Sequence, residues 1–352
     1  MLTFESYEAA VEQCFANGWT DGLPVVPPTP GKVRAFLATV PRRPDEPLPY
    51  YAERGRVVTV EKVAVNAVMA GCLPEYFPVV LAIADVLFDP DLDFHAAHSS
   101  TGGVALGWVL NGPIRRAIGA NAQGNVLGPG NRANSTIGRA IRLLQINAMG
   151  SVPGAGHDDS SPLEILDRST LGQPAKYACF HVPEHEEAEP SLAPLHVERG
   201  FRPEQNVVTV FATGGGMQVS LHADQTAAEI AESIGDHLLH LGRHDPTGWL
   251  VLVLTPEAAR LVARNGWSKA RLREAVFDGS TRHVGWFREA GLSVVGHYYG
   301  ARRNPPPQPD DDERLLTVTA GPDDVQVVVA GGPAGAWAYF LVPYGPIASK
   351  AF

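Results

Sequence analysis

Two stretches of the chain share one order of local structure, and that order restricts the fold more than any other feature. Each predicts a buried strand, a proline and then a helix rich in alanine and arginine: GWVLNGPIRRAIGAN from Gly107, and GWLVLVLTPEAARLVARNG from Gly248. A second arginine-bearing helix follows each of them. Strands that alternate with helices are typical of α/β proteins. We therefore expect an α/β fold of two α/β halves, residues 1–205 and 206–352, with mixed sheets and a cleft between the halves.

The similarity of these stretches has two explanations. The halves are pseudo-repeats, or they are separate strand–helix units that use the same turn residues. With 352 residues, the chain is long enough for two domains or for one large domain.

The composition and charge exclude several classes of protein. A content of 45% hydrophobic and 19% charged residues is typical of soluble globular proteins. The formal net charge of −10 argues against nucleic acid or an anionic membrane as partner, because both attract basic surfaces. No apolar run reaches the roughly 18–20 residues that cross a bilayer, and the first residues lack the pattern of a signal peptide. We expect a cytoplasmic protein, and homo-oligomer formation stays open.

The apolar stretch over residues 63–87 is interrupted by Gly71, Cys72 and Pro74. A proline is favourable just inside a helix start, so Cys72 is predicted at or just before a helix N-terminus. There the helix dipole favours a thiolate and lowers the thiol pKa. A reactive cysteine and a small buried side chain both fit this pattern. The three cysteines of the chain form no CxxC pair, which indicates neither a disulfide framework nor a thiolate zinc site.

The segment WTDGLPVVPPTPG begins at Trp19 and contains Thr20 and Asp21. Its prolines predict an extended, rigid stretch with few backbone hydrogen bonds. Such a stretch is a surface strap or a loop that faces a substrate.

A glycine-rich loop over residues 124–134 leads into a predicted helix. Asn134, Ser135 and Thr136 are good capping residues for that helix, and Arg132 lies beside them. Backbone N–H groups at a helix N-terminus hold carboxylates or phosphates, although an ordinary capped helix has the same pattern. The loop matches neither a P-loop nor the dinucleotide-binding GxGxxG motif.

Histidines and carboxylates gather in the 181–198 cluster, which contains His181, His185 and His196. With His95, these histidines are candidate ligands of a divalent metal. A polar segment flanked by prolines is more typical of a solvated loop. The histidine three residues after His95 would lie on the opposite face of an expected strand, which argues against a metal pair there.

Five segments of the chain suggest a relationship to a known family: WTDGLPVVPPT, AVNAVMAGCLPEYFPVV, LNGPI, GPGNRANSTIGRAIRL and VVVAGGPAG. They resemble segments of the bacterial UGSC-type (seleno)proteins and their DGLPVVPPT-containing relatives. The resemblance covers most of the chain, and its first two segments are long enough to be specific. It implies an enzyme built on this scaffold, with redox or thiol chemistry in the members that carry the selenocysteine-Gly-Ser-Cys motif.

The chain departs from that family at three places. It lacks the selenocysteine-Gly-Ser-Cys motif. The relatives are expected to carry Thr-His-Pro before the NGP turn and Gly-Lys-His-Ser after the late AGG. Here those stretches read Thr101-Gly102-Gly103 and Gly335-Ala336-Trp337, so the reaction is expected to differ.

These patterns support three hypotheses. The first is an enzyme without an organic cofactor that cleaves a carbon–heteroatom bond, as a lyase does, in a small polar substrate with a carboxylate or phosphate. The second is a metal-dependent enzyme that uses His95 and the 181–198 cluster. The third is a non-catalytic homologue that binds a small molecule, which the lost histidines at Gly102 and Ala336 favour.

The first hypothesis gives each candidate residue a role. Cys72 acts as nucleophile or acid–base thiol, Asp21 moves a proton or orients the substrate, and Asn111 donates to a developing oxyanion. The substrate would be held by the helix start and by the head of the proline-rich segment: Arg132, Asn134, Ser135, Thr136, Trp19 and Thr20.

Overall fold

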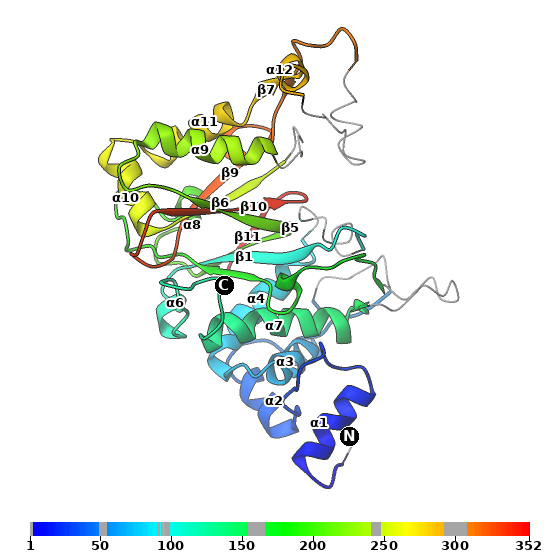
Figure 1. Cartoon of the computed structure of the whole chain (residues 1–352). Helices are drawn as coiled ribbons and strands as arrows, with labels where there is room; N and C mark the ends of the chain where they lie inside the picture. Colours follow the sequence, from blue (N-terminus) through cyan, green and yellow to red (C-terminus); the bar gives the residue numbers. More distant parts are fainter. Residues whose placement is uncertain are drawn as a thin grey trace.

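A mixed sheet of seven strands lies in the middle of the molecule, with helices on both sides (Figure 1). The computed structural model describes residues 3–48, 55–89, 92, 94, 99–153, 166–240, 248–291 and 308–352. Within them, parallel and antiparallel strands share one sheet in the order β4-β1-β5-β10-β6-β9, and β11 also pairs with β5. The predicted α/β fold is therefore confirmed.

The strands of this sheet are β1 (Ala105–Asn111), β4 (Phe180–Pro183), β5 (Val207–Ser220), β6 (Leu250–Leu254), β9 (Val325–Val329), β10 (Trp337–Pro343) and β11 (Ala348–Ala351). Two short pairs lie apart from it: β2 (Val152–Pro153) with β3 (Leu166–Asp167), and β7 (Arg282–His283) with β8 (Leu315–Leu316).

The first group of helices is α1 (Tyr7–Ala16), α2 (Pro30–Leu37), α3 (Val60–Met69), α4 (Phe77–Val86), α6 (Ile114–Ala117) and α7 (Arg132–Asn147). The later helices are α8 (Leu195–Glu198), α9 (Ala227–His240), α10 (Pro256–Arg264), α11 (Lys269–Gly279) and α12 (Val284–Glu289). The described ranges also contain three short 3-10 helices: η2 (Pro74–Tyr76), η4 (Pro174–Lys176) and η6 (Pro322–Asp324). No helix of the described ranges is long and apolar enough to cross a membrane.

The sheet has the same pattern of pairing at both edges: a parallel pair of strands, followed by an antiparallel strand towards the centre. β1 and β4 are parallel and are joined through α6 and α7, while β6 and β9 are parallel and are joined through α10 and α11. β5 and β10 are antiparallel neighbours in the centre. Because strands of both predicted halves share one sheet, and β5 begins just after the expected boundary, the pattern agrees with a pseudo-repeat. The pseudo-repeat, the division at residue 205 and the cleft between the halves stay predictions.

Each face of the sheet packs against different partners. The outer face of β1 and β5 packs against α3, α4 and α7, and that of β6, β9 and β10 packs against α9, α10 and α11. The inner faces pack against each other, through Val109, Val182, Phe211, Val253 and Val328 among others. This alternation follows from the period of two in a strand.

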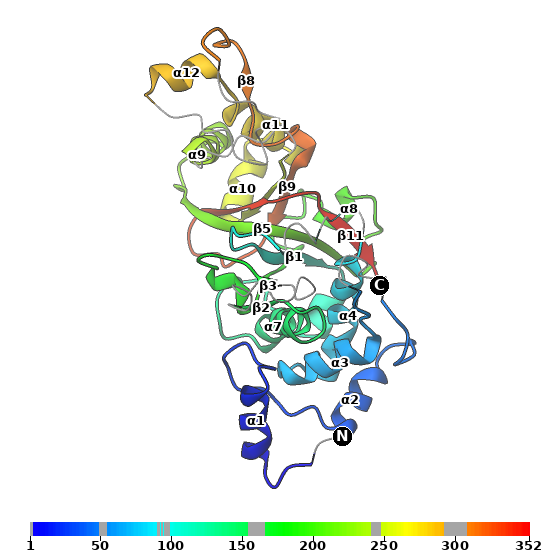
Figure 2. The same ribbon diagram turned by 90° about the vertical axis from the view of Figure 1, so that its right-hand side faces the viewer.

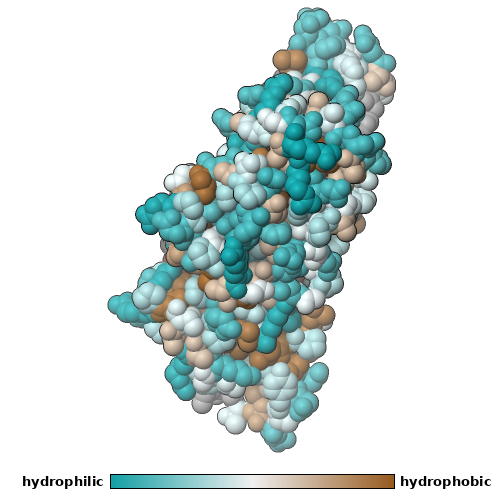
Figure 3. All heavy atoms as spheres, turned by 90° about the vertical axis from the view of Figure 1, so that its left-hand side faces the viewer, coloured by the Kyte–Doolittle hydropathy of each residue, from teal (hydrophilic) through white to brown (hydrophobic). Residues whose placement is uncertain are grey.

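In the turned view, too, the sheet lies between α9, α10 and α11 on one side and α3, α4 and α7 on the other (Figure 2). Its two edge strands, β4 and β9, are joined just beyond their ends. His185, which follows β4, donates its backbone N–H to the carbonyl of Val329 at the end of β9, at 2.7 Å. The residues that follow β4 are therefore held between both ends of the sheet. One face of the molecule is covered mainly by polar side chains, with smaller apolar patches mostly in its lower half (Figure 3).

Local chemistry sets the ends of the elements around the predicted site. β1 is followed directly by Gly112, which has a φ of +91° and where a Cβ would lie 2.2 Å from the carbonyl oxygen of Gln205. Only glycine fits this turn. α7 begins at Arg132 because the side chain of Asn131 accepts the backbone N–H of Asn134 at 3.0 Å, as an N-cap does.

Candidate functional site

The proline-rich segment is attached to α7 through Asp21. The guanidinium of Arg139 donates from Nε and Nη2 to the two carboxylate oxygens, both at 2.8 Å, and Nη2 also donates to the carbonyls of Leu23 and Pro24. The Asp21 side chain is only 4% exposed. Arg139 thus fixes Asp21 at the start of the proline-rich segment that begins at Trp19, which is called the strap below. Asp21 also lines a pocket.

Trp19 and Thr20 lie at the entrance to this strap. The Trp19 carbonyl accepts Nδ2 of Asn147, from the last turn of α7, at 3.2 Å, while its side chain is exposed. Thr20 accepts the backbone N–H of Gly22 at 3.1 Å within the turn. Both contacts hold the strap, and substrate binding by these two residues stays a prediction.

Cys72 lies in the turn between α3 and η2, next to the start of α7. Gly71 has a φ of +86°, and its carbonyl accepts Nε of Arg132 at 3.0 Å. The thiol of Cys72 donates to the carbonyl of Thr136 at 3.3 Å, and the side chain is buried. The structure therefore brings together Cys72, Arg132 and Thr136.

Burial raises the pKa of the Cys72 thiol to about 12, and the hydrogen bond at Thr136 and the charge of Arg132 only partly oppose it. The expected lowering of this pKa is wrong, because removing the thiol from water outweighs the helix dipole. The Cys72 thiol is therefore protonated, and it donates a hydrogen bond to α7 at the end of α3. A catalytic role for Cys72 stays a prediction without support from this geometry.

A pocket of about 550 Å3 lies beside the second half of α7. One wall is the head of the strap and α7, with Asp21, Arg142 and Ile146. The opposite wall is the segment of residues 167–177. The lining is completed by Asp167, Ser169, Leu171, Gly172, Gln173, Pro174, Lys176 and Tyr177.

Lys176 is the central polar group of this pocket. Its Nζ donates to Oδ1 of Asp167 at 2.5 Å and to the hydroxyl of Ser169. The other oxygen of Asp167 accepts Nη2 of Arg142 at 2.8 Å. The Lys176 side chain is 16% exposed and that of Asp167 is 4% exposed, so the group is mostly shielded from water.

The environment shifts the pKa values of this pair in the same direction. Burial lowers the pKa of Lys176, and the charge of Arg142 adds to this effect, although Asp167 opposes it. Burial would raise the pKa of Asp167, but hydrogen bonds from Lys176 and Ser169 and the charge of Arg142 outweigh it and lower the pKa to about 2. A buried carboxylate thus holds an amine that releases its proton more easily than a lysine in water.

The charges around the pocket do not cancel. Asp21 is paired with Arg139, whereas Asp167 faces both Arg142 and Lys176. These side chains are three cations and two carboxylates, which leaves one positive charge in excess. Such a pocket favours an anionic ligand.

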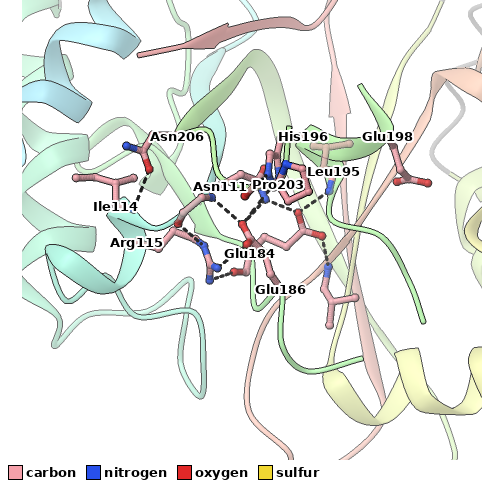
Figure 4. Close-up of polar contacts among 12 residues, drawn as sticks. Asn111, Ile114, Arg115, Glu184, Glu186, Leu195, His196, Glu198, Pro203 and Asn206 are labelled. Carbon is pink, nitrogen blue, oxygen red and sulfur yellow. Dashed lines mark hydrogen bonds and ion pairs between the residues drawn. The ribbon is translucent and has the colours of Figure 1, made fainter. Parts of the chain in front are cut away.

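Asn111 lies elsewhere, in a buried network at the end of β1 (Figure 4). Its Nδ2 donates to Glu184 at 2.7 Å and to Glu186 at 3.0 Å. Glu184 also accepts the backbone N–H of Leu195 and lies 3.4 Å from Nζ of Lys269. Because two carboxylates already occupy the Asn111 amide group, the predicted oxyanion role of this residue has no support here.

The 181–198 cluster is partly buried inside the molecule. His181, Glu184 and His196 are 4%, 1% and 0% exposed. The expectation of a solvated loop is wrong for these three residues, because His181 lies on β4, Glu184 follows β4 directly, and His196 lies on the buried side of α8.

The candidate metal ligands are not brought together within the described part of the chain. No group of three or more histidine, cysteine, aspartate or glutamate side chains in these ranges is placed to hold a metal ion. His196 contacts the carbonyl of Pro203 at 3.3 Å, and His95 lies outside the described residues. A divalent metal and a cofactor-free mechanism both stay untested predictions.

Asn134 and Ser135 lie in the first turn of α7, as expected, but they differ in what they contact. The Asn134 side chain accepts from the backbone of Asn121 and donates to the carbonyls of Asn121 and Val126, so it holds the preceding loop. Ser135 lines a second, smaller cavity. The predicted loop and helix start are present, and their binding of a substrate stays a prediction.

The sequence patterns missed Lys176, Asp167, Ser169 and Arg142. These residues follow no known motif. They come from α7 and from the segment that runs from β3 to η4. One available signal was the placement of two oppositely charged residues, Asp167 and Lys176, on either side of the turn residues Gly172 and Pro174.

No protein-family model matches the chain, and no curated protein sequence is significantly similar to it. The resemblance to the UGSC-type proteins therefore stays an expectation from the motifs alone.

Proposed function

We propose that the chain is an enzyme that cleaves a carbon–heteroatom bond in a small anionic substrate, with Lys176 as the group that transfers the proton. The observation that carries the proposal is the Lys176 amine, held by Asp167 and Ser169 in a pocket of about 550 Å3. A lysine whose pKa is lowered by burial is suited to acid–base catalysis.

The charge of the pocket supports the class of substrate. With one positive charge in excess among the side chains named above, a carboxylate or phosphate group is favoured over a neutral or cationic one. The volume of about 550 Å3 is within the range of small-molecule sites.

The proposed step is an elimination. Lys176 is charged when the substrate binds; its ammonium group then gives a proton to solvent, and the resulting amine takes the proton from the carbon next to the substrate carboxylate. The electron pair of that C–H bond forms a carbon–carbon double bond, and the bond to the heteroatom breaks with both its electrons. The leaving group then takes up a proton from solvent, so no oxidant or reductant is needed.

Asp167 and Arg142 would act as positioning residues. Asp167 fixes the direction of the Lys176 amine, and Arg142 keeps Asp167 ionised. The proposal also includes a cytoplasmic location, which agrees with three cysteines that are free among the described residues.

The test is turnover of a panel of carboxylates that carry an amino, hydroxyl or thioether group on the third carbon, adjacent to the carbon that loses its proton, read as the absorbance of the unsaturated product. Lys176→Met should reduce kcat by about 100-fold or more, within the range of general acid–base catalysis. Lys176→Arg keeps the charge but not the titratable amine, and should fail in the same way.

Two results would contradict the proposal. Full turnover in Lys176→Met would remove the assigned proton-transfer group. Stabilisation of the protein by the same carboxylates, without any product in the wild-type chain, would favour the non-catalytic binding protein instead.

A further inference from the structure

A second cavity lies beside the first turn of α7. It has a volume of about 150 Å3 and is lined by residues 126–129 of the glycine-rich loop, by Asn134 and Ser135, and by Ala178, Cys179 and His181. Leu127 and Pro129 are exposed at its rim, whereas His181 is buried at the sheet.

This cavity is separate from the pocket of Lys176. The segment after η4 crosses α7 at Gly138, where a Cβ would lie 1.6 Å from the carbonyl oxygen of Ala178. Residues 173, 174, 176 and 177 line the first pocket, and residues 178, 179 and 181 line the second. The close contact at Gly138 thus divides the two.

His181 is the most unusual group of the cavity. It is 4% exposed, and its ring lies against that of Trp108, with 5.5 Å between the centroids. Neither ring nitrogen has a hydrogen-bond partner among the described residues. Buried polar groups without a partner are rare and call for a bound molecule or an ordered water.

The imidazole is a neutral group here. Burial lowers the pKa of His181 to about 3, and a polar contact with the backbone of Asn134, which falls outside normal hydrogen-bond geometry, only partly opposes this. A neutral imidazole has one N–H donor and one acceptor nitrogen. It can therefore donate one hydrogen bond to an anion without carrying a charge of its own.

The rest of the lining also suits an anion. The hydroxyl of Ser135 lies on the first turn of α7, a helix of 16 residues, whose N-terminus carries a partial positive charge. The lining contains no carboxylate. Cys179 is held in the left-handed region, at a φ of +56°, which is costly for a residue other than glycine and is found more often at functional sites.

We propose that this cavity binds a small oxyanion, phosphate or carboxylate, through the N–H of His181 and the O–H of Ser135. The site is independent of the function proposed for Lys176 and does not depend on any turnover there.

The experiment is a titration of the full chain, labelled with 15N in its histidine rings, with inorganic phosphate and with acetate at constant ionic strength. Sodium chloride is the control anion, and His181→Gln assigns the His181 signals. We expect a saturable shift of the His181 ring signals with one oxyanion or both, and none with chloride. Saturation by phosphate alone, or by acetate alone, identifies the oxyanion.

Variants show which groups bind. Ser135→Ala should weaken the binding about tenfold, because one hydrogen bond to an anion is lost. His222→Gln, at an exposed histidine far from the lining, should leave it unchanged. Lys176→Met should also leave it unchanged, which distinguishes this site from the first pocket.

Three outcomes would overturn the proposal. They are the absence of a saturable shift at His181 with either oxyanion, an equal shift with chloride, and loss of binding in Lys176→Met. If His181→Gln does not fold, unchanged affinity in Ser135→Ala would still contradict it.

Discussion

Arg139 on α7 holds both carboxylate oxygens of Asp21, from a position 118 residues away along the chain, in a pair that is mostly shielded from water. A bidentate guanidinium–carboxylate pair has two parallel hydrogen bonds, which lysine does not reproduce. We predict that Arg139→Lys lowers the free energy of unfolding by about 2 kcal/mol, measured by urea denaturation.

The matched control is Arg202→Lys, because Arg202 pairs with Glu204 while both side chains are more than half exposed. This variant should change the free energy of unfolding by less than about 0.5 kcal/mol. Equal effects of the two variants would show that the strap is held by its prolines rather than by Asp21.

The lowered pKa of Asp167 predicts that the folded protein loses stability in acid. Its pKa is lowered from the ordinary 3.8 to about 2 in the folded protein, so folding favours the ionised form. The stabilisation is complete above pH 4 and is lost as the pH falls from about 4 to about 2, by about 2 kcal/mol in all. The measurement is the free energy of unfolding against pH for the wild type and Asp167→Asn.

The difference between these two proteins should shrink over that range of pH. A constant part remains, because the amide NH2 in Asp167→Asn cannot accept the hydrogen bond that Arg142 donates to the carboxyl group. Asp45→Asn, at a side chain that is 78% exposed, is the control and should give a curve parallel to the wild type. A difference that does not change between pH 5 and pH 2 would contradict the lowered pKa.

The elements that local chemistry determines were predictable. α7 is expected from its capping residues, and the two strand–helix stretches are expected from their apolar runs and prolines, and both are present. The position of Cys72 between two helical segments was also correct. Its pKa was not, since a helix start is visible in the sequence and the burial of a thiol depends on what packs over it.

The pocket and the buried network could not be predicted in this way. Lys176 and Asp167 meet Arg142 only because residues 167–177 cross α7, and no periodicity specifies that crossing. Glu184 was interpreted as part of a solvated loop because its neighbours are polar. It is buried because the sheet brings the end of β9 next to the end of β4.

Glu184 links both predicted halves of the chain, and its replacement should destabilise the folded protein. It accepts from Asn111 in β1 and lies 3.4 Å from Lys269 in α11, and both groups are buried. In Glu184→Gln, Lys269 faces an amide instead of a carboxylate and keeps Glu198, at 3.3 Å, as its ionic partner. We predict a loss of about 3 kcal/mol in the free energy of unfolding, measured in urea.

The control for that variant is Glu204→Gln, at a side chain that is 66% exposed, with an expected change below about 0.5 kcal/mol. A small effect of Glu184→Gln, similar to that of the control, would show that the backbone contacts between β4 and β9 suffice to join the halves.

The cysteines should react slowly with alkylating reagents in the folded protein. Burial raises the pKa of Cys72 and of Cys179 to about 12, so at pH 8 only a very small fraction of either is thiolate. We expect iodoacetamide to label both cysteines in urea at the rate of a free thiol, and hardly at all in the folded protein, as read for each cysteine by peptide mass spectrometry. Fast labelling of Cys72 in the folded protein, with an apparent pKa below the ~8.5 of a free thiol, would instead favour the reactive cysteine, one of the two interpretations that the sequence leaves open.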